Sequence, residues 1–163
     1  MKAIVTGSFD PITLGHIELI KYASRKYDQV YVVALVNENK EYMFTMEQKK
    51  ALIQKATKEF HNVIADAYIG LTADYMHKNG ISHIVRGVRN EQDMAYEENL
   101  AQKMKEFDSD FATEIVSCKE KYANISSSNV REKIINNEPL DDMLPKEIIN
   151  LLNDFYQENK NAR

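Results

Sequence analysis

Residues 3–16 read AIVTGSFDPITLGH and join a short apolar run to a helical pattern through a turn that contains two glycines. The apolar run predicts a first strand from Ala3 to Thr6. After the turn, apolar residues recur every three or four positions, so we expect a helix from about Gly15 to Tyr27 with one face packed on a sheet. A strand that leads through a short turn into a helix is typical of the start of an α/β fold.

The same alternation of apolar runs and helical patterns continues along the chain. The further strands that we expect are 30–36, 63–69, 83–86 and 114–117. The further helices that we expect begin at Thr45, with Gln48 completing a capping box, and then run over 72–79, 91–107, 128–136 and 145–156. This order predicts a Rossmann-like α/β fold, in which a five-stranded parallel sheet carries helices on both faces.

Length and composition predict one domain. The chain has 163 residues, of which 44% are hydrophobic and 28% are charged, and such a chain can bury a sizeable core. We find no internal repeat and no Pro- or Gly-rich linker that would separate two domains. We therefore expect a single domain over residues 1–163, with a polar tail at 157–163 that frays.

Charge and cysteine content argue against several classes of protein. A net charge of -4 is unlike a nucleic-acid-binding surface, so any phosphate site must be local. Cys118 is the only cysteine, which excludes internal disulfides and suits a reducing cytoplasm. Gly7 comes too early for the apolar region of a signal peptide, and no later segment approaches about 18 unbroken apolar residues. We expect a cytoplasmic protein without a membrane partner.

The turn from Gly7 to His16 is the most informative stretch for function. In an open α/β sheet, ligands bind beyond the carboxyl ends of the strands, and the free N–H groups of a helix N-terminus favour anions. Ser8 supplies a hydroxyl, and His16 can direct a ring N–H at a phosphate. The segment matches neither the dinucleotide fingerprint G-x-G-x-x-G nor the P-loop G-x-x-x-x-G-K-[ST]. The alternative is an ordinary turn with an incidental histidine.

The segment GSFDPITLGH (7–16) resembles the G-x-F-D-P-x-T-x-G-H signature of the nucleotidyltransferase superfamily, which also contains the class I tRNA synthetases. Its T-x-G-H form is similar to that of the phosphopantetheine adenylyltransferase family. Three further segments extend the resemblance over nearly the whole chain, in the family's order: 37–45 (NENKEYMFT), 84–97 (IVRGVRNEQDMAYE) and 122–128 (YANISSS). Met94 stands where the family commonly has phenylalanine, and Tyr122 where it often has tryptophan.

The resemblance implies a role for individual residues. His16 and Lys40 are expected to be catalytic, and the residues expected to bind the acceptor are Ser8, Lys40, Thr72 and Arg86, with Arg86 on its phosphate. The residues expected to bind ATP are Ser8, Phe9, His16, Gly87, Val88, Arg89, Glu97, Tyr122, Ala123, Asn124, Ile125, Ser126, Ser127 and Ser128.

The residues themselves leave other interpretations open. Lys40 could be a solvated loop lysine, and Thr72 could be a plain helix N-cap. The two arginines of the RGVR segment could pair with Asp93 and Glu97 in a surface network rather than bind phosphate. Cys118 has no evident base beside it, so we expect a small buried hydrophobic residue rather than a nucleophile. The widely spaced histidines predict no protein metal site.

The resemblance also implies a reaction and partners. The adenylyl group of ATP would pass reversibly to 4′-phosphopantetheine, giving dephospho-coenzyme A and pyrophosphate, by in-line attack without a covalent enzyme intermediate. A Mg²⁺ ion is expected with ATP, held mostly by phosphate oxygens and water. The family implies a homohexamer and feedback binding of coenzyme A. The competing interpretations are a related enzyme that uses nicotinate mononucleotide or glycerol phosphate, and a regulatory module that binds ATP without turning it over.

Overall fold

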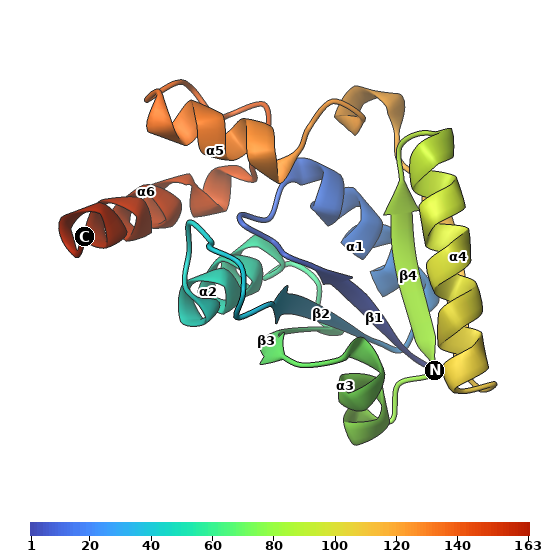
Figure 1. Ribbon diagram of the computed structural model, residues 1–163. Helices are drawn as coiled ribbons and strands as arrows, with labels where there is room; N and C mark the ends of the chain where they lie inside the picture. Colours follow the sequence, from blue (N-terminus) through green and yellow to red (C-terminus); the bar gives the residue numbers. More distant parts are fainter.

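A computed structural model of the chain describes all residues from 1 to 163. Its strands form one sheet in the order β3-β2-β1-β4-β5, in which every neighbouring pair is parallel (Figure 1). The strands are β1 (Lys2–Gly7), β2 (Gln29–Val36), β3 (Val63–Ile69), β4 (His83–Val88) and β5 (Ala112–Ser117). The five-stranded parallel sheet predicted from the sequence is confirmed, and each strand lies within two residues of its expected bounds.

Six α-helices and one short 3₁₀ helix connect and follow these strands. They are α1 (Leu14–Lys26), α2 (Met46–Ala56), α3 (Thr72–Asn79), α4 (Glu91–Phe107), η1 (Glu120–Tyr122), α5 (Ser127–Ile135) and α6 (Lys146–Asn161). No helix combines the length and the apolar character that a membrane span requires.

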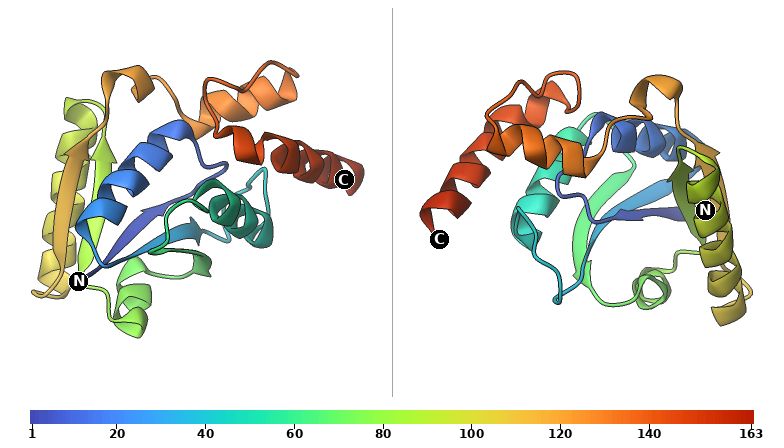
Figure 2. Two further views of the ribbon diagram at one scale, coloured as in Figure 1. Left: turned by 180° about the vertical axis from the view of Figure 1, so that it is seen from behind. Right: turned by 45° about the horizontal axis from the view of Figure 1, so that its top comes forward.

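The helices cover both faces of the sheet (Figures 1 and 2). One face packs against α1, α2, α5 and α6, and alternate strand residues such as Val5 and Val32 point into this larger core. The other face packs against α3 and α4, with Ile4 and Val33 pointing toward them. This alternation follows from the two-residue period of a strand, and it explains why the central strands are apolar almost throughout.

The strand order positions a ligand site at one edge of the sheet. From β1 the chain continues through α1 to β2 and through α2 to β3, both on one side of β1. The connection through α3 then leads to β4, on the other side of β1. The carboxyl ends of β1 and β4 therefore lie side by side where the direction of winding changes. Ligands of open α/β sheets bind at such a switch point.

Local capping explains where several helices begin and end. Thr13 caps α1 and Thr45 caps α2, each in a capping box, as predicted for Thr45. Gly80 ends α3 in the left-handed conformation with φ +63°, which a residue with a Cβ adopts less readily. The predicted bounds of α3 and α4 are confirmed because both the cap and the helical pattern indicate the same residues.

The C-terminal tail differs from the prediction. We expected the last helix to end at Tyr156 and residues 157–163 to fray, whereas α6 continues to Asn161. The reason is a contact across 111 residues of sequence: the Asn159 side chain donates to Gln48 Oε1 at 2.8 Å and accepts from Gln48 Nε2 at 2.9 Å. The same side chain donates to the Met43 carbonyl at 2.8 Å. These bonds tie the last turns of α6 to α2 and to the loop before it.

Candidate active site

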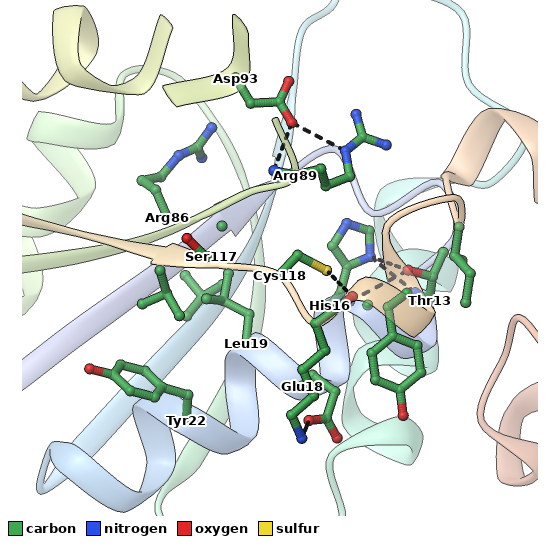
Figure 3. Close-up of a pocket in the computed structure, with 18 of the residues that line it drawn as sticks. Thr13, His16, Glu18, Leu19, Tyr22, Arg86, Arg89, Asp93, Ser117 and Cys118 are labelled. Atoms are coloured by element: carbon green, nitrogen blue, oxygen red, sulfur yellow. Dashed lines mark hydrogen bonds and ion pairs between the residues drawn. The ribbon is translucent and has the colours of Figure 1, made fainter. Parts of the chain in front are cut away.

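A pocket of about 580 Å³ opens at the switch point of the sheet. Its wall is built from the carboxyl ends of β1, β4 and β5, from α1 along most of its length, and from the N-terminal parts of α4 and α5 (Figure 3). The predicted site residues that line it are His16, Arg86, Gly87, Arg89, Glu97, Tyr122, Ile125, Ser126 and Ser127. The chain thus brings three of the four sequence segments singled out above into one cavity.

His16 is oriented by its own helix cap. Its Nδ1 accepts a hydrogen bond from the Thr13 backbone N–H at 3.0 Å, and the Phe9 ring packs edge-on against the imidazole with centroids 4.9 Å apart. Burial, and then the charges of Arg89 and Arg86, lower the pKa of His16 to about 4. The imidazole is therefore neutral near pH 7, and since Nδ1 accepts, its proton resides on Nε2. His16 can donate this N–H to a phosphate.

Arg86 lies at the end of β4 and is fixed on two sides. Its Nε and Nη2 donate to the two Glu97 carboxylate oxygens at 2.8 and 2.7 Å. Its Nη1 donates to the Thr6 carbonyl at 3.0 Å and to Thr6 Oγ1 at 2.8 Å. These bonds hold the guanidinium rigidly and leave one Nη2 N–H without an acceptor in the protein. Part of the guanidinium is open to the pocket, where it can contact an anion.

Arg89 follows β4 and lies beside the N-terminus of α4. Its Nε pairs with Asp93 Oδ2 at 3.2 Å (Figure 3). Together with the Arg86–Glu97 pair, this is the pairing of both arginines with Asp93 and Glu97 that we set out as an alternative to phosphate binding. The pairs are present, and both arginines nevertheless line the pocket. Pairing and anion binding are thus compatible at this site.

The serines at the start of α5 make local hydrogen bonds. Ser126 is the N-cap and accepts from the Asn129 N–H at 3.1 Å, while Ser127 Oγ donates to the Pro11 carbonyl at 2.8 Å. Ser128 Oγ accepts from Arg131 Nη2 at 3.1 Å and does not line the pocket. The first N–H groups of α5 lie at the cavity wall and provide an anion site of the helix N-terminal type.

Several predicted site residues lie outside the pocket wall. Phe9 and Val88 are buried behind it, while Ser8 and Lys40 are exposed. The residues of the turn before α5 that are also outside it are Ala123 and Asn124. Thr72 is the first residue of α3, whose N-cap is Leu71, so our N-cap alternative for Thr72 is wrong.

Lys40 and Thr72 follow β2 and β3 on the far side of β1 from the pocket. Since all strands of the sheet are parallel, the carboxyl ends of β2 and β3 share an edge with those of β1 and β4. Both residues therefore belong to the same edge of the sheet as the pocket, displaced along it. A second substrate bound beside the pocket would meet them there.

The pocket also contains residues that the sequence did not reveal. Thr6 holds Arg86, Thr13 orients His16, and Glu18 pairs with Lys119 at the rim. Cys118 is half-buried in the pocket wall rather than in the core, and burial raises the pKa of its thiol. Their positions in the sequence could have indicated two of them, because Thr6 and Cys118 lie at the carboxyl ends of β1 and β5, where ligands of such sheets bind.

Asp10 joins the motif turn to two other segments. Its buried carboxylate accepts from the backbone N–H groups of Met43 and Phe44 at 2.9 and 3.0 Å. Its carbonyl accepts from Arg131 Nη1 of α5 at 2.8 Å. The turn before α1, the loop that carries Lys40 and the serine turn of α5 are thus fixed relative to one another.

Fold and site together define a class of protein. Residues 4–133 match the family model for cytidylyltransferase-like proteins. A solved structure of a bifunctional NMN adenylyltransferase/ADP ribose pyrophosphatase from Francisella tularensis has the same fold, with a TM-score of 0.73 at 16% identity over 97% of this chain and 51% of that one. The class is that of the nucleotidyltransferases.

Curated relatives narrow the class to one family. The phosphopantetheine adenylyltransferase of Clostridium novyi is 37% identical over 90% of this chain and 91% of its own. That of Bdellovibrio bacteriovorus is 38% identical over 90% of this chain and 92% of its own. The chain belongs to the phosphopantetheine adenylyltransferase family, as the resemblance of its four segments predicted.

Proposed function

We propose that this protein transfers the adenylyl group of ATP to 4′-phosphopantetheine and releases dephospho-coenzyme A and pyrophosphate. The observation that carries the proposal is the pocket at the switch point, whose wall contains the neutral imidazole of His16, the fixed cation Arg86 and the cation Arg89. Such donors suit a reaction between two anions, because they offset charge without supplying a nucleophile. The family of the curated relatives supports the choice of acceptor.

ATP would occupy the pocket itself. The N–H of His16 Nε2 and the N-terminus of α5 would supply donors to its phosphates, and Gly87 of β4 and Tyr122 of η1 would supply a wall for the nucleoside. Ser8, at the start of the motif turn, would lie between the two substrates. The roles of Phe9, Val88 and the rest of the turn before α5 follow from the family resemblance.

The acceptor would bind beside ATP along the edge of the sheet, with its phosphate on Arg86 and Lys40 and its chain passing Thr72. One oxygen of that phosphate attacks the α-phosphorus of ATP in line, the new P–O bond forms, and the bond to the bridging oxygen breaks with pyrophosphate leaving. His16 and Lys40 stabilise the charge that grows on the α-phosphoryl oxygens. The acceptor phosphate is already anionic, so no protein base is needed.

A Mg²⁺ ion would accompany ATP and neutralise charge on its phosphates. The carboxylates of the pocket are each paired with a cation, Glu18 with Lys119, Asp93 with Arg89 and Glu97 with Arg86. This donor set fits an ion that the nucleotide and water hold, as Mg²⁺ commonly is in phosphoryl-transfer sites.

The test is pyrophosphate release from MgATP with and without 4′-phosphopantetheine, with nicotinate mononucleotide and glycerol 3-phosphate as parallel acceptors. Release that requires 4′-phosphopantetheine, with dephospho-coenzyme A as product, is expected. Release with either of the other acceptors alone would assign a different transferase. Binding of ATP without release in any of the three assays would favour a regulatory module.

A homohexamer, feedback binding of coenzyme A and a cytoplasmic location belong to the same proposal and rest on the family. Light scattering of the purified protein tests the assembly, which is expected at about six times the chain mass of 18.8 kDa. Competition between coenzyme A and 4′-phosphopantetheine in the pyrophosphate assay tests the feedback site. A measured mass of only one or two chains would contradict the hexamer. Inhibition by coenzyme A that does not depend on the acceptor concentration would contradict binding at the acceptor site.

A further inference from the structure

Lys49 is the most unusual polar residue of this protein. Its side chain is 0% exposed, and its Nζ has no hydrogen-bond partner although it is buried. Burial lowers the pKa of Lys49 to about 8; the Asp10 carboxylate opposes this shift and the Arg131 guanidinium adds to it. A buried ammonium without a hydrogen bond is costly, and no step of the proposed reaction uses it.

The ammonium of Lys49 has one direct partner, an aromatic ring. Its Nζ lies 3.4 Å from the centroid of the Tyr42 ring, and such a cation–π contact is strongest where water is excluded. The hydroxyl of the same tyrosine accepts a hydrogen bond from the backbone N–H of Asn37 at 3.0 Å. Tyr42 thus connects the core of α2 to the first residue after β2.

The segment between these contacts is the Lys40 loop, residues 37–44. Within it, the Lys40 N–H donates to the Asn37 carbonyl at 3.0 Å. At its end, Met43 and Phe44 donate to the Asp10 carboxylate. The backbone of the loop is therefore attached at both ends, and the exposed Lys40 side chain projects from between the attachments.

We propose that Lys49 and Tyr42 are positioning residues that hold the Lys40 loop so that Lys40 meets the acceptor phosphate. The inference rests on the proposed function, in which Lys40 acts on that phosphate. A methionine could fill the space under Tyr42 without burying a charge. Unlike methionine, the ammonium of Lys49 attracts the face of the Tyr42 ring electrostatically, through the quadrupole of the ring, and so holds the ring in place.

The variants that test this are Lys49→Met, Tyr42→Leu and Tyr42→Phe, with Lys55→Met as the matched control on the exposed side of α2. Lys49→Met and Tyr42→Leu are expected to lower kcat about tenfold while the KM for MgATP stays unchanged, because a small displacement of a catalytic group is enough for such a loss. Tyr42→Phe keeps the ring and loses only the hydrogen bond from the Asn37 N–H. Its kcat is expected to lie between that of these two variants and that of the parent.

Hydrogen exchange of the 37–44 peptide provides a readout that does not depend on activity. Exchange is expected to be faster in Lys49→Met and Tyr42→Leu than in the parent, and unchanged in Lys55→Met. The Asn37 amide is expected to exchange faster in Tyr42→Phe as well, because it loses its acceptor.

A double-mutant cycle separates positioning from general stability. If the pair acts through Lys40, Lys49→Met in a Lys40→Ala background lowers kcat by less than about twofold further. Losses that multiply in the double variant would overturn the inference, as would parental kcat and parental exchange in Lys49→Met. A parent protein without acceptor-dependent pyrophosphate release would overturn the proposed function and this inference together, whereas an active parent with an unaffected Lys49→Met variant overturns the inference alone.

Discussion

At the scale of single residues, the electrostatic state of His16 follows from three neighbours. Thr13 donates its backbone N–H to Nδ1, and burial, followed by the charges of Arg89 and Arg86, disfavours a second ring proton. The ring is then a neutral donor through Nε2, which can stay bonded to a phosphate through the whole reaction without giving up its proton. Its contribution is electrostatic, like that of an oxyanion-hole donor.

This state predicts how His16 titrates. Its pKa in the folded protein is lowered from 6.5 to about 4, so the ring stays neutral as the pH falls through 6.5 and gains a proton only near pH 4. Imidazole ¹⁵N shifts between pH 8 and pH 5 are expected to stay constant and to report a proton on Nε2. A midpoint near pH 6.5 would contradict the assignment.

Removing the His16 ring predicts a loss of rate without a loss of fold. His16→Ala is expected to lower turnover by about 10² to 10³, the usual cost of one such donor. The melting temperature serves as the control. It should fall by only a few degrees, because the ring accepts one backbone hydrogen bond, from the Thr13 N–H, and such a bond contributes about 1 kcal/mol. Turnover equal to that of the parent would remove His16 from the mechanism.

Thr6 predicts a separate effect on the acceptor. Thr6→Val keeps the shape of the strand residue but removes the hydroxyl that accepts from Arg86 Nη1. A hydrogen bond to a charged group contributes about 1.5–3 kcal/mol, so a looser Arg86 should raise the KM for 4′-phosphopantetheine about tenfold or more. Thr6→Ser is expected to restore the parental KM. A KM within twofold of the parent in Thr6→Val would exclude this role.

Adjacent lysines show why residue environments escaped the sequence. Lys49 and Lys50 are identical neighbours on α2, yet Lys49 is fully buried while Lys50 reaches Asp66 at 3.3 Å from a half-exposed position. Lysine side chains are mostly exposed in proteins, so the residue type predicts the same exposed position for both. Lys49 lies on the face of α2 that also buries Leu52 and Ile53. The Tyr42 ring covers its ammonium, and that contact depends on the fold of the loop.

At the scale of elements, most of the fold could be predicted because local signals agree. The bounds of α3, α4 and β3 follow from periodicity bounded by a cap or a turn. The end of α6 could not be predicted, since the polar sequence after Tyr156 has no local reason to be helical. Its stability comes from Asn159, whose partners lie on α2 and the preceding loop.

The role of Asn159 predicts a measurable loss of stability. Asn159→Ala removes three hydrogen bonds, each of which contributes about 1 kcal/mol, so the free energy of unfolding should fall by about 2–3 kcal/mol. Urea unfolding measures this change. Asn153→Ala, at an exposed position of the same helix, is the control and should behave like the parent. Alanine favours the helix more than asparagine does, so helix propensity alone would stabilise both variants. Equal changes in the two variants would therefore mean that the hydrogen bonds of Asn159 contribute nothing to stability.

At the scale of the whole molecule, the candidate site was predictable as a location but not as a set of contacts. Motifs at strand ends must meet at one edge of a parallel sheet, and this brought His16, Arg86 and Ser126 to one pocket. The hydrogen bonds that Arg86 donates to Thr6 and that Met43 donates to Asp10 join residues 80 and 33 positions apart. No local pattern encodes such pairs.

The titrating groups of the core also give the whole molecule a pH dependence of stability. Burial lowers the pKa of Lys49 from 10.5 to about 8. Burial first, and then hydrogen bonds to Glu114 and Asp66, raise the pKa values of Tyr27 and Tyr75 above 10. Between pH 8 and 10 the unfolded chain therefore binds a proton at residue 49 that the folded chain has lost, and stability rises with pH. Above pH 10 the folded chain retains the tyrosine protons, and stability falls.

Lys49→Met isolates the first of these contributions. The variant loses a cation–π contact of about 2 kcal/mol but also the larger cost of burying an ammonium, so at pH 7 it should be as stable as the parent or more stable. As the parent approaches pH 10 its Lys49 is neutral in the fold, and the advantage of the variant should shrink. Urea unfolding at pH 7, 8, 9 and 10 measures both curves, with Lys55→Met as the control that keeps the parental slope. Parallel curves for the parent and Lys49→Met would mean that Lys49 titrates as an exposed lysine does, and that its ammonium is not confined beneath the Tyr42 ring.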